Sequence, residues 1–122
     1  MGIAVSNSIV ADKSFDFAVK IVKLYKYLCD EKREFVLSRQ LLRSGTSIGA
    51  NVSEALQGQS KRDFLMKMNI ALKETSETKY WLRLLRAAEY TSDEEQQLVF
   101  SDCIELEKLL TSIVKTTSEK TK

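Results

Sequence analysis

The sequence predicts an all-α fold, an up-down-up-down antiparallel four-helix bundle that forms one domain over residues 1–122. Apolar residues recur at helical spacing along almost the whole chain, and no segment shows the alternation typical of a strand. The chain contains no proline, the residue that most often stops a helix, and only four glycines. We expect helices near residues 14–31, 34–56, 60–89 and 92–115, joined by short connections that make consecutive helices antiparallel.

The helix expected near residues 14–31 has a broad apolar face. Ser14 or Asp12 is positioned to cap its N-terminus. Lysines and aspartates fill the opposite side, so a partly basic back should face solvent. The residues expected to be buried are Phe15, Phe17, Ala18, Ile21, Val22, Leu24, Tyr25, Leu28 and Cys29.

The helix expected near residues 34–56 carries Gly45 and Gly49 on one face, and Gly58 should end it. A glycine inside a helix costs about 1 kcal/mol relative to alanine, so we interpret the pair as a packing or assembly site where another helix approaches closely. The alternative is a phosphate-binding loop, but the segment lacks the Walker pattern and no strand precedes it. The expected core line of this helix is Leu37, Leu41, Ile48, Val52 and Ala55.

The helix expected near residues 60–89 has two apolar faces, whereas a helix in an isolated bundle needs only one. Ser60 should cap its start together with Asp63. Because the second face needs its own burial partner, we assign Trp81 to packing or assembly. The first face consists of Phe64, Met68, Ala71, Leu72, Thr75 and Leu82, and the second of Met66, Ile70, Trp81, Leu84 and Ala88.

The helix expected near residues 92–115 begins with Ser92 as its cap, followed by acidic residues that favour the positive end of the helix dipole. The polar tail from Thr116 should fray. The core stripe of this helix is Val99, Cys103, Leu106, Leu110, Ile113 and Val114.

The composition excludes several kinds of chemistry. Histidine is absent, which excludes Ser-His-Asp and Cys-His catalysis and zinc sites that need imidazole. Cys29 and Cys103 each fall in a helical pattern, and we expect both to be reduced thiols in the core of a cytoplasmic protein. No stretch is long and apolar enough to span a membrane. We expect no catalytic residues, no metal, no cofactor and no membrane partner.

Lys73, Glu74 and Glu77 lie between apolar residues of the third expected helix. A carboxylate beside apolar surface needs a partner, and Arg39 or Arg43 can supply bidentate hydrogen bonds, within the chain or from a neighbouring copy. We favour such an ion pair, with Glu77 in packing or assembly, over solvated charges. Acid–base catalysis by the cluster is the last alternative, because the sequence offers no histidine and no metal motif.

The net charge of +2 is unevenly distributed, because the basic excess lies in residues 1–90 while residues 91–122 are net acidic. Basic side chains usually form a solvated surface. Repeated around a ring, they would form a continuous surface suited to phosphate backbones. The candidate contacts with nucleic acid or a partner are Lys20, Lys23, Arg39, Arg43, Lys73 and Arg83.

A block from about Leu37 to Leu85 carries a specific pattern. Its segments are Leu41–Ser44, Ser47–Asn51, Glu54-Ala55, Ser60-Lys61, Asp63-Phe64, Ile70–Glu74, Glu77-Thr78 and Tyr80–Leu82. The pattern resembles the four-helix-bundle family of 23S rRNA intervening-sequence proteins. That family also includes the accessory variability determinant proteins of diversity-generating retroelements.

The resemblance implies a bacterial, cytoplasmic bundle that assembles as a homopentameric ring and has no enzymatic activity. Some members are encoded in insertions of ribosomal RNA genes, and the retroelement members are basic adaptors that bind nucleic acid and a reverse transcriptase. We therefore expect a homo-oligomer that binds RNA, DNA or a nucleic-acid-processing partner such as a reverse transcriptase. The alternatives are a protein–protein scaffold without nucleic-acid binding and, last, an enzyme that uses Lys73, Glu74 and Glu77.

Overall fold

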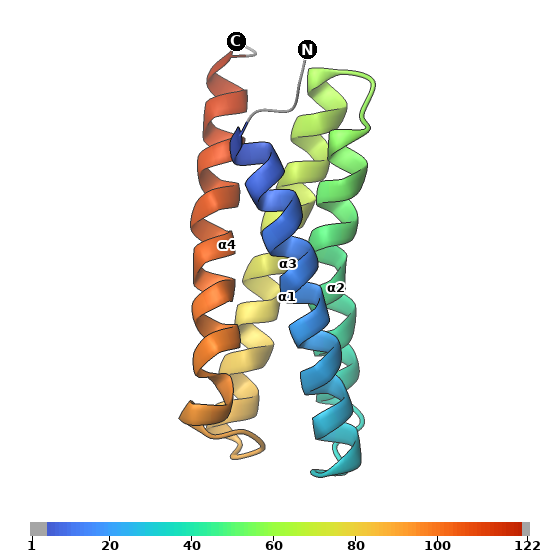
Figure 1. Ribbon diagram of the computed structural model, residues 1–122, viewed down its shortest axis with the longest axis vertical. Coiled ribbons are helices and arrows are strands. Elements are labelled where there is room, and N and C mark those ends of the chain that lie inside the picture. The colour runs from blue at the N-terminus through green and yellow to red at the C-terminus, as the bar shows by residue number, and fades with distance from the viewer. Residues whose placement is uncertain (1–4, 121–122) are drawn as a thin grey trace.

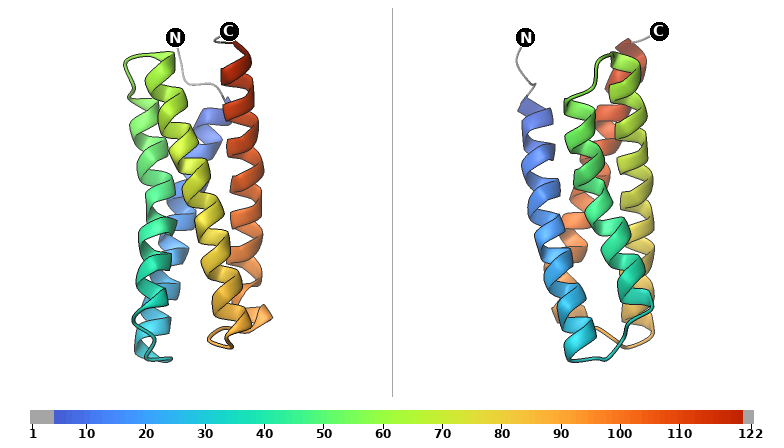
Figure 2. Two further views of the ribbon diagram at one scale, coloured as in Figure 1. Left: turned by 180° about the vertical axis from the view of Figure 1, so that it is seen from behind. Right: turned by 90° about the vertical axis from the view of Figure 1, so that its right-hand side faces the viewer.

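The computed structural model of the chain describes residues 5–120 as four helices that run up, down, up and down (Figure 1). They are α1 (Val5–Asp30), α2 (Leu37–Leu56), α3 (Lys61–Ala87) and α4 (Asp93–Lys120). Each helix lies beside the next along the chain, and α1 also contacts α4, which closes the bundle (Figure 2). The predicted all-α bundle is confirmed.

All four helices contribute to one core. A fully buried aliphatic or aromatic side chain contributes about 1.5–3 kcal/mol to stability, so this core accounts for much of the folding free energy. No helix in the described part of the chain combines the length and the apolar character needed to cross a membrane. The buried apolar residues are Val10, Phe17, Ile21, Leu28, Leu41, Ile48, Val52, Ala55, Met68, Ala71, Leu82, Leu85, Val99, Cys103, Leu106, Leu110 and Ile113.

α1 begins at Val5, so the start predicted near residue 14 is wrong. Val10 is fully buried, and the helix continues through it because this side chain completes the core at that end. Ser14 is therefore not a cap. It is buried in mid-helix, and its hydroxyl donates to the Ala11 carbonyl at 3.2 Å.

The apolar face predicted for α1 is too broad. Phe17, Ile21 and Leu28 are buried, but Phe15 is 67% exposed and Val22 is 40% exposed. Periodicity measures apolar character, and it does not say which apolar residues face the core of the same chain.

α2 begins at Leu37 rather than near Glu34, and Glu34 caps it from outside the helix. One oxygen of its carboxylate accepts from the Ser38 backbone N–H at 2.7 Å, and the other accepts from those of Val36 and Leu37, each at 3.1 Å. Burial alone would raise the pKa of Glu34. The backbone hydrogen bonds outweigh it and hold that pKa below its ordinary value.

The two predicted serine caps are confirmed. The Ser60 hydroxyl accepts from the Asp63 N–H at 3.1 Å. Ser92 and Glu95 form a reciprocal capping box, because the Ser92 hydroxyl accepts from the Glu95 N–H at 3.1 Å and the Glu95 carboxylate accepts from the Ser92 N–H at 2.8 Å.

α4 continues to Lys120, past the end predicted near residue 115. The tail from Thr116, predicted to fray, is helical as far as Lys120. Ile113 is buried in the core, and its carbonyl accepts from the Thr117 hydroxyl at 2.7 Å. These contacts hold the last turns in helical form.

α1 packs closely against α2 at both glycines. A Cβ atom on Gly45 would lie 2.8 Å from both γ carbons of Ile21. A Cβ atom on Gly49 would lie 3.2 Å from the backbone oxygen of Ser14. Larger side chains at either position would push the two helices apart.

Candidate interaction surfaces

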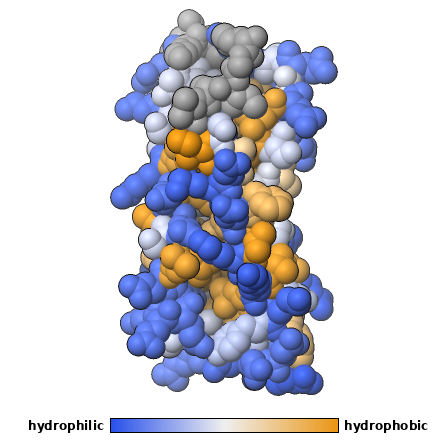
Figure 3. Space-filling model, viewed as in Figure 1, coloured by the Kyte–Doolittle hydropathy of each residue, from blue (hydrophilic) through white to orange (hydrophobic). Residues whose placement is uncertain are grey.

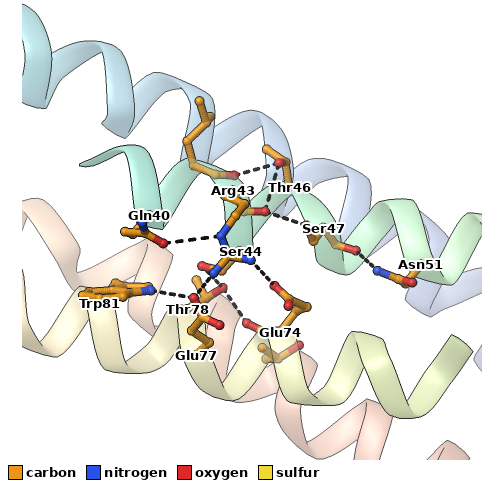
Figure 4. A network of polar contacts seen from close by, with 12 residues as sticks. Gln40, Arg43, Ser44, Thr46, Ser47, Asn51, Glu74, Glu77, Thr78 and Trp81 are labelled. Atoms are coloured by element: carbon orange, nitrogen blue, oxygen red, sulfur yellow. Dashed lines mark hydrogen bonds and ion pairs between the residues drawn. The ribbon is translucent and has the colours of Figure 1, made fainter. Parts of the chain in front are cut away.

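Arg43 of α2 forms a polar network with the neighbouring face of α3 (Figure 4). One guanidinium nitrogen lies 3.3 Å from the Glu74 carboxylate, and the other donates to Glu77. The same oxygen of Glu77 accepts from the Trp81 indole at 2.9 Å, and Gln40 lies 3.4 Å from Arg43 Nε. Charge-assisted hydrogen bonds of this kind are stronger than neutral ones, and here they join α2 to α3.

Beneath this network, the hydroxyls of Ser44 and Thr78 lie 2.9 Å apart, and both residues are fully buried (Figure 4). The Thr78 hydroxyl also lies 2.7 Å from the Glu74 carbonyl. Each buried hydroxyl thus has a partner, which removes the cost of burying it. The sequence analysis did not single out this pair, although Ser44 and Thr78 lie in the block that carries the family resemblance.

This network contains the partner that the sequence predicts for the acidic residues of α3. Glu74 and Glu77 pair with Arg43 of the same chain, while Lys73 is exposed. Paired carboxylates that hold a guanidinium and an indole suit a structural role better than acid–base chemistry. The arrangement therefore supports the ion-pair interpretation over the enzyme alternative.

Two of the six candidate basic contacts are charge-compensated within the chain. Arg43 has its two carboxylates, and Lys20 of α1 pairs with Asp102 of α4. Lys20 belongs to a polar seam between α1 and α4, whose other contacts are Lys13 with Glu105 and Tyr27 with Glu95.

The other four candidates, Lys23, Arg39, Lys73 and Arg83, are exposed and form no ion pair within residues 5–120. They do not form one cluster. Lys23 and Arg39 lie at the end of the bundle where α1 connects to α2, and Lys73 and Arg83 lie on α3.

The connection between α1 and α2 adds basic residues that the sequence analysis did not consider. The exposed acids at this end of the bundle are Asp30 and Glu31, together with Glu89, Asp93, Glu94 and Glu95 around the α3–α4 connection, which lies at the same end (Figure 1). Glu34 is occupied as the cap of α2. The adjacent Lys32 and Arg33 in the connection are the signal in the sequence that indicates these basic residues. The basic end is defined as Lys23, Lys26, Lys32, Arg33 and Arg39, all exposed.

The second apolar face predicted for α3 is exposed in its first turns, whereas Trp81 packs against the core of the protomer. Met66 is 53% exposed and Ile70 is 36% exposed. Trp81 and Leu84 are half-buried in the same face. These four residues are called the α3 stripe below.

A second apolar surface lies between α1 and α2, where a groove of about 620 Å³ opens to solvent. Phe15 stands at this groove, and Figure 3 shows hydrophobic residues reaching the surface of the face that α1 and α2 present. The groove was not predicted from the sequence, because the helical pattern places Phe15 in the core. The residues that line the α1–α2 groove are Ala11, Phe15, Ala18, Thr46, Gly49, Ala50, Val52, Ser53, Leu56 and Gln57.

The two cysteines are free thiols in different surroundings. Cys103 is fully buried and donates to the Thr75 carbonyl at 3.6 Å. Burial, reinforced by Glu107, raises the pKa of the Cys103 thiol to about 12. Cys29 is only half-buried, with its sulfur 3.8 Å from the Ser38 hydroxyl.

Comparisons with known proteins confirm the resemblance seen in the sequence. The family model of the 23S rRNA-intervening sequence protein matches residues 6–112. A crystal structure of a protein of unknown function from the S23 ribosomal protein family, from Bacteroides thetaiotaomicron, is 55% identical in sequence and superposes with a TM-score of 0.89. The match covers 91% of this chain and 99% of that chain. No curated protein matches the chain significantly. The chain belongs to the 23S rRNA-intervening sequence protein family.

Proposed function

We propose that this protein is a non-enzymatic homo-oligomer whose assembled form binds nucleic acid, or a partner that processes nucleic acid, through its basic surface. The observation that carries the proposal is the pair of exposed apolar surfaces, the α3 stripe and the α1–α2 groove. A protomer that stayed alone in water would leave both surfaces solvated, and exposed apolar patches of this kind mark interaction sites.

The family resemblance implies a pentameric ring in the bacterial cytoplasm. Self-association would repeat the basic end once per subunit around that ring. Repetition matters because the basic residues of one protomer form a small site, whereas several copies around a ring present several such sites to one phosphate backbone. The family name, which refers to intervening sequences of 23S rRNA, makes RNA the first ligand to test.

A binding assay with a structured RNA and with duplex DNA tests the nucleic-acid part. Affinity set by phosphate contacts should fall steeply between about 50 mM and about 200 mM salt. Replacing Lys32 and Arg33 by glutamine should weaken binding to all sequences alike and flatten the salt dependence. Replacing Lys108 and Lys115 of α4 is the matched control, because it removes the same charge elsewhere and should change binding less.

A protein–protein scaffold is the second candidate, and the apolar surfaces themselves favour it. In that case RNA and DNA would remain unbound even at low salt, while the protein would still self-associate. Absence of binding at low salt would therefore exclude the nucleic-acid proposal and leave the scaffold.

A further inference from the structure

We propose that the connection between α1 and α2 binds an unpaired nucleotide, whose base stacks on Phe35 while Lys32 and Arg33 contact the phosphates beside it. The site rests on the nucleic-acid binding proposed above and narrows the ligand to a single strand rather than a duplex. An exposed ring, the cations around it and the acidic residues at this end of the bundle support that choice.

Phe35 is an aromatic side chain that the fold leaves in contact with solvent. It is 46% exposed, and its neighbour Val36 is 73% exposed, so neither belongs to the core. An exposed ring presents a flat apolar face on which any base can stack, irrespective of sequence. Only unpaired bases can do so, because the bases of a duplex are already stacked on one another.

The backbone holds Phe35 in place without burying it. The Glu34 N–H donates to the Leu28 carbonyl of α1 at 2.9 Å. The Glu34 carboxylate accepts from the N–H groups of Val36 at 3.1 Å and Ser38 at 2.7 Å. These hydrogen bonds tie the connection to the end of α1 and to the start of α2. A ring that is already fixed loses little freedom when a base stacks on it.

Cations surround the ring. The Arg33 guanidinium carbon lies 5.4 Å from the centre of the Phe35 ring, and Lys32 Nζ lies 5.9 Å from the centre of the Tyr27 ring. Lys32, Arg33 and Arg39 are exposed, and none of them forms an ion pair within residues 5–120. Cations beside a stacking ring match a nucleotide strand, which carries a phosphate next to every base.

The acidic residues at this end of the bundle disfavour wide or stiff polyanions. Asp30 and Glu31 are exposed beside the connection, and Glu89 and Glu94 are exposed around the α3–α4 connection at the same end (Figure 1). An anionic membrane would face all of this surface, and a duplex is too stiff to bend around the carboxylates. A flexible single strand can follow the cations of the α1–α2 connection alone.

Fluorescence anisotropy tests the base contact, with labelled oligouridine as the single strand and the same strand paired with oligoadenosine as the duplex. Phe35→Leu keeps an apolar side chain but removes the ring. It should weaken single-strand binding about tenfold and leave the affinity for the duplex and the salt dependence unchanged, because it removes no charge. Phe35→Tyr keeps a ring and should retain most of the affinity. Tyr80→Leu removes a 55% exposed ring on α3 and is the matched control, which should bind as the wild type does.

Arg33→Gly tests the phosphate contact. Arg33 has a φ of 54°, in the left-handed region that glycine adopts without strain, so the variant should keep the melting temperature of the wild type. It should bind both RNAs more weakly and flatten the salt dependence, because a cation beside the phosphates is lost.

Unchanged single-strand affinity in Phe35→Leu, or an equal loss in Tyr80→Leu, would overturn the stacking site while leaving nucleic-acid binding in place. A wild type that binds neither RNA at low salt would instead refute the binding on which the site rests. Vesicles of phosphatidylserine and phosphatidylcholine probe the membrane alternative. Cosedimentation of the wild type but not of Phe35→Leu with these vesicles, without single-strand binding, would overturn the proposal in favour of a membrane contact.

Discussion

The Trp81 indole donates to the Glu77 carboxylate one helical turn earlier, at 2.9 Å, and this contact fixes the carboxylate that receives Arg43 from α2. The side chain of Arg43 is still 50% exposed, and Glu77 is 35% exposed. Solvent therefore screens the pair, and the network aligns two helices more than it adds stability.

Arg43→Ala should leave the bundle folded and lower its free energy of unfolding by at most about 1 kcal/mol, because exposed ion pairs contribute little. We expect the variant to weaken assembly or ligand binding, since Glu74 and Glu77 then lose their partner. Urea unfolding measures the first effect and light scattering the second. Lys115→Ala, at an exposed position of α4 without an ion pair among residues 5–120, is the control, and a loss of several kcal/mol for Arg43→Ala would contradict this account.

Gly49→Leu should destabilise the bundle by about 1–3 kcal/mol or prevent assembly, because its side chain would meet the Ser14 backbone of α1. Thermal unfolding followed by circular dichroism measures the effect. Ser112→Leu adds the same side chain at an exposed position of α4, away from the groove, and should change the melting temperature far less. Unchanged melting and oligomer size for Gly49→Leu would show that the packing account is wrong.

The Glu34 cap should make stability depend on pH in the acid range. Because the backbone hydrogen bonds depress the pKa of Glu34 in the folded state, its contribution is full above the unfolded value of about 4.3 and is lost as pH falls through the folded pKa. Glu34→Gln should cost about 1 kcal/mol at neutral pH. The difference from the wild type should shrink below about pH 4, and a difference independent of pH would contradict the assignment.

The two cysteines should differ in reactivity toward iodoacetamide under native conditions. Cys29 is half-buried and should be alkylated first, whereas burial of Cys103 and its pKa of about 12 leave almost no thiolate near neutral pH. Mass spectrometry should show one adduct, on Cys29, until the protein is unfolded. Equal rates at the two sites would mean that the core around Cys103 opens readily.

Helical periodicity was enough to predict the bundle, and the serine caps were readable because Ser60 and Ser92 stand directly before their helices. The starts of α1 and α2 could not be predicted correctly from the sequence. Val10 continues an apolar pattern that looked complete at Phe15. Glu34 caps α2 through its long side chain, so its position resembles the first turn of a helix.

The candidate surfaces were harder to predict, because they depend on contacts between distant segments. The pairing of Arg43 with acidic residues was foreseeable from their types, but Lys20 finds Asp102 only because α1 and α4 are neighbours in the fold. Phe15 shows a second limit of prediction from the sequence. A pattern of apolar residues does not separate those that face the core from those that are exposed on the protomer, as Phe15 is.

The central claim is that the exposed stripe and groove bring copies of this chain together. Multi-angle light scattering of the wild-type protein at micromolar concentration tests it most directly. We predict a single species at a multiple of the protomer mass, five protomers if the family resemblance extends to the ring. A stable monomer at that concentration would contradict the claim.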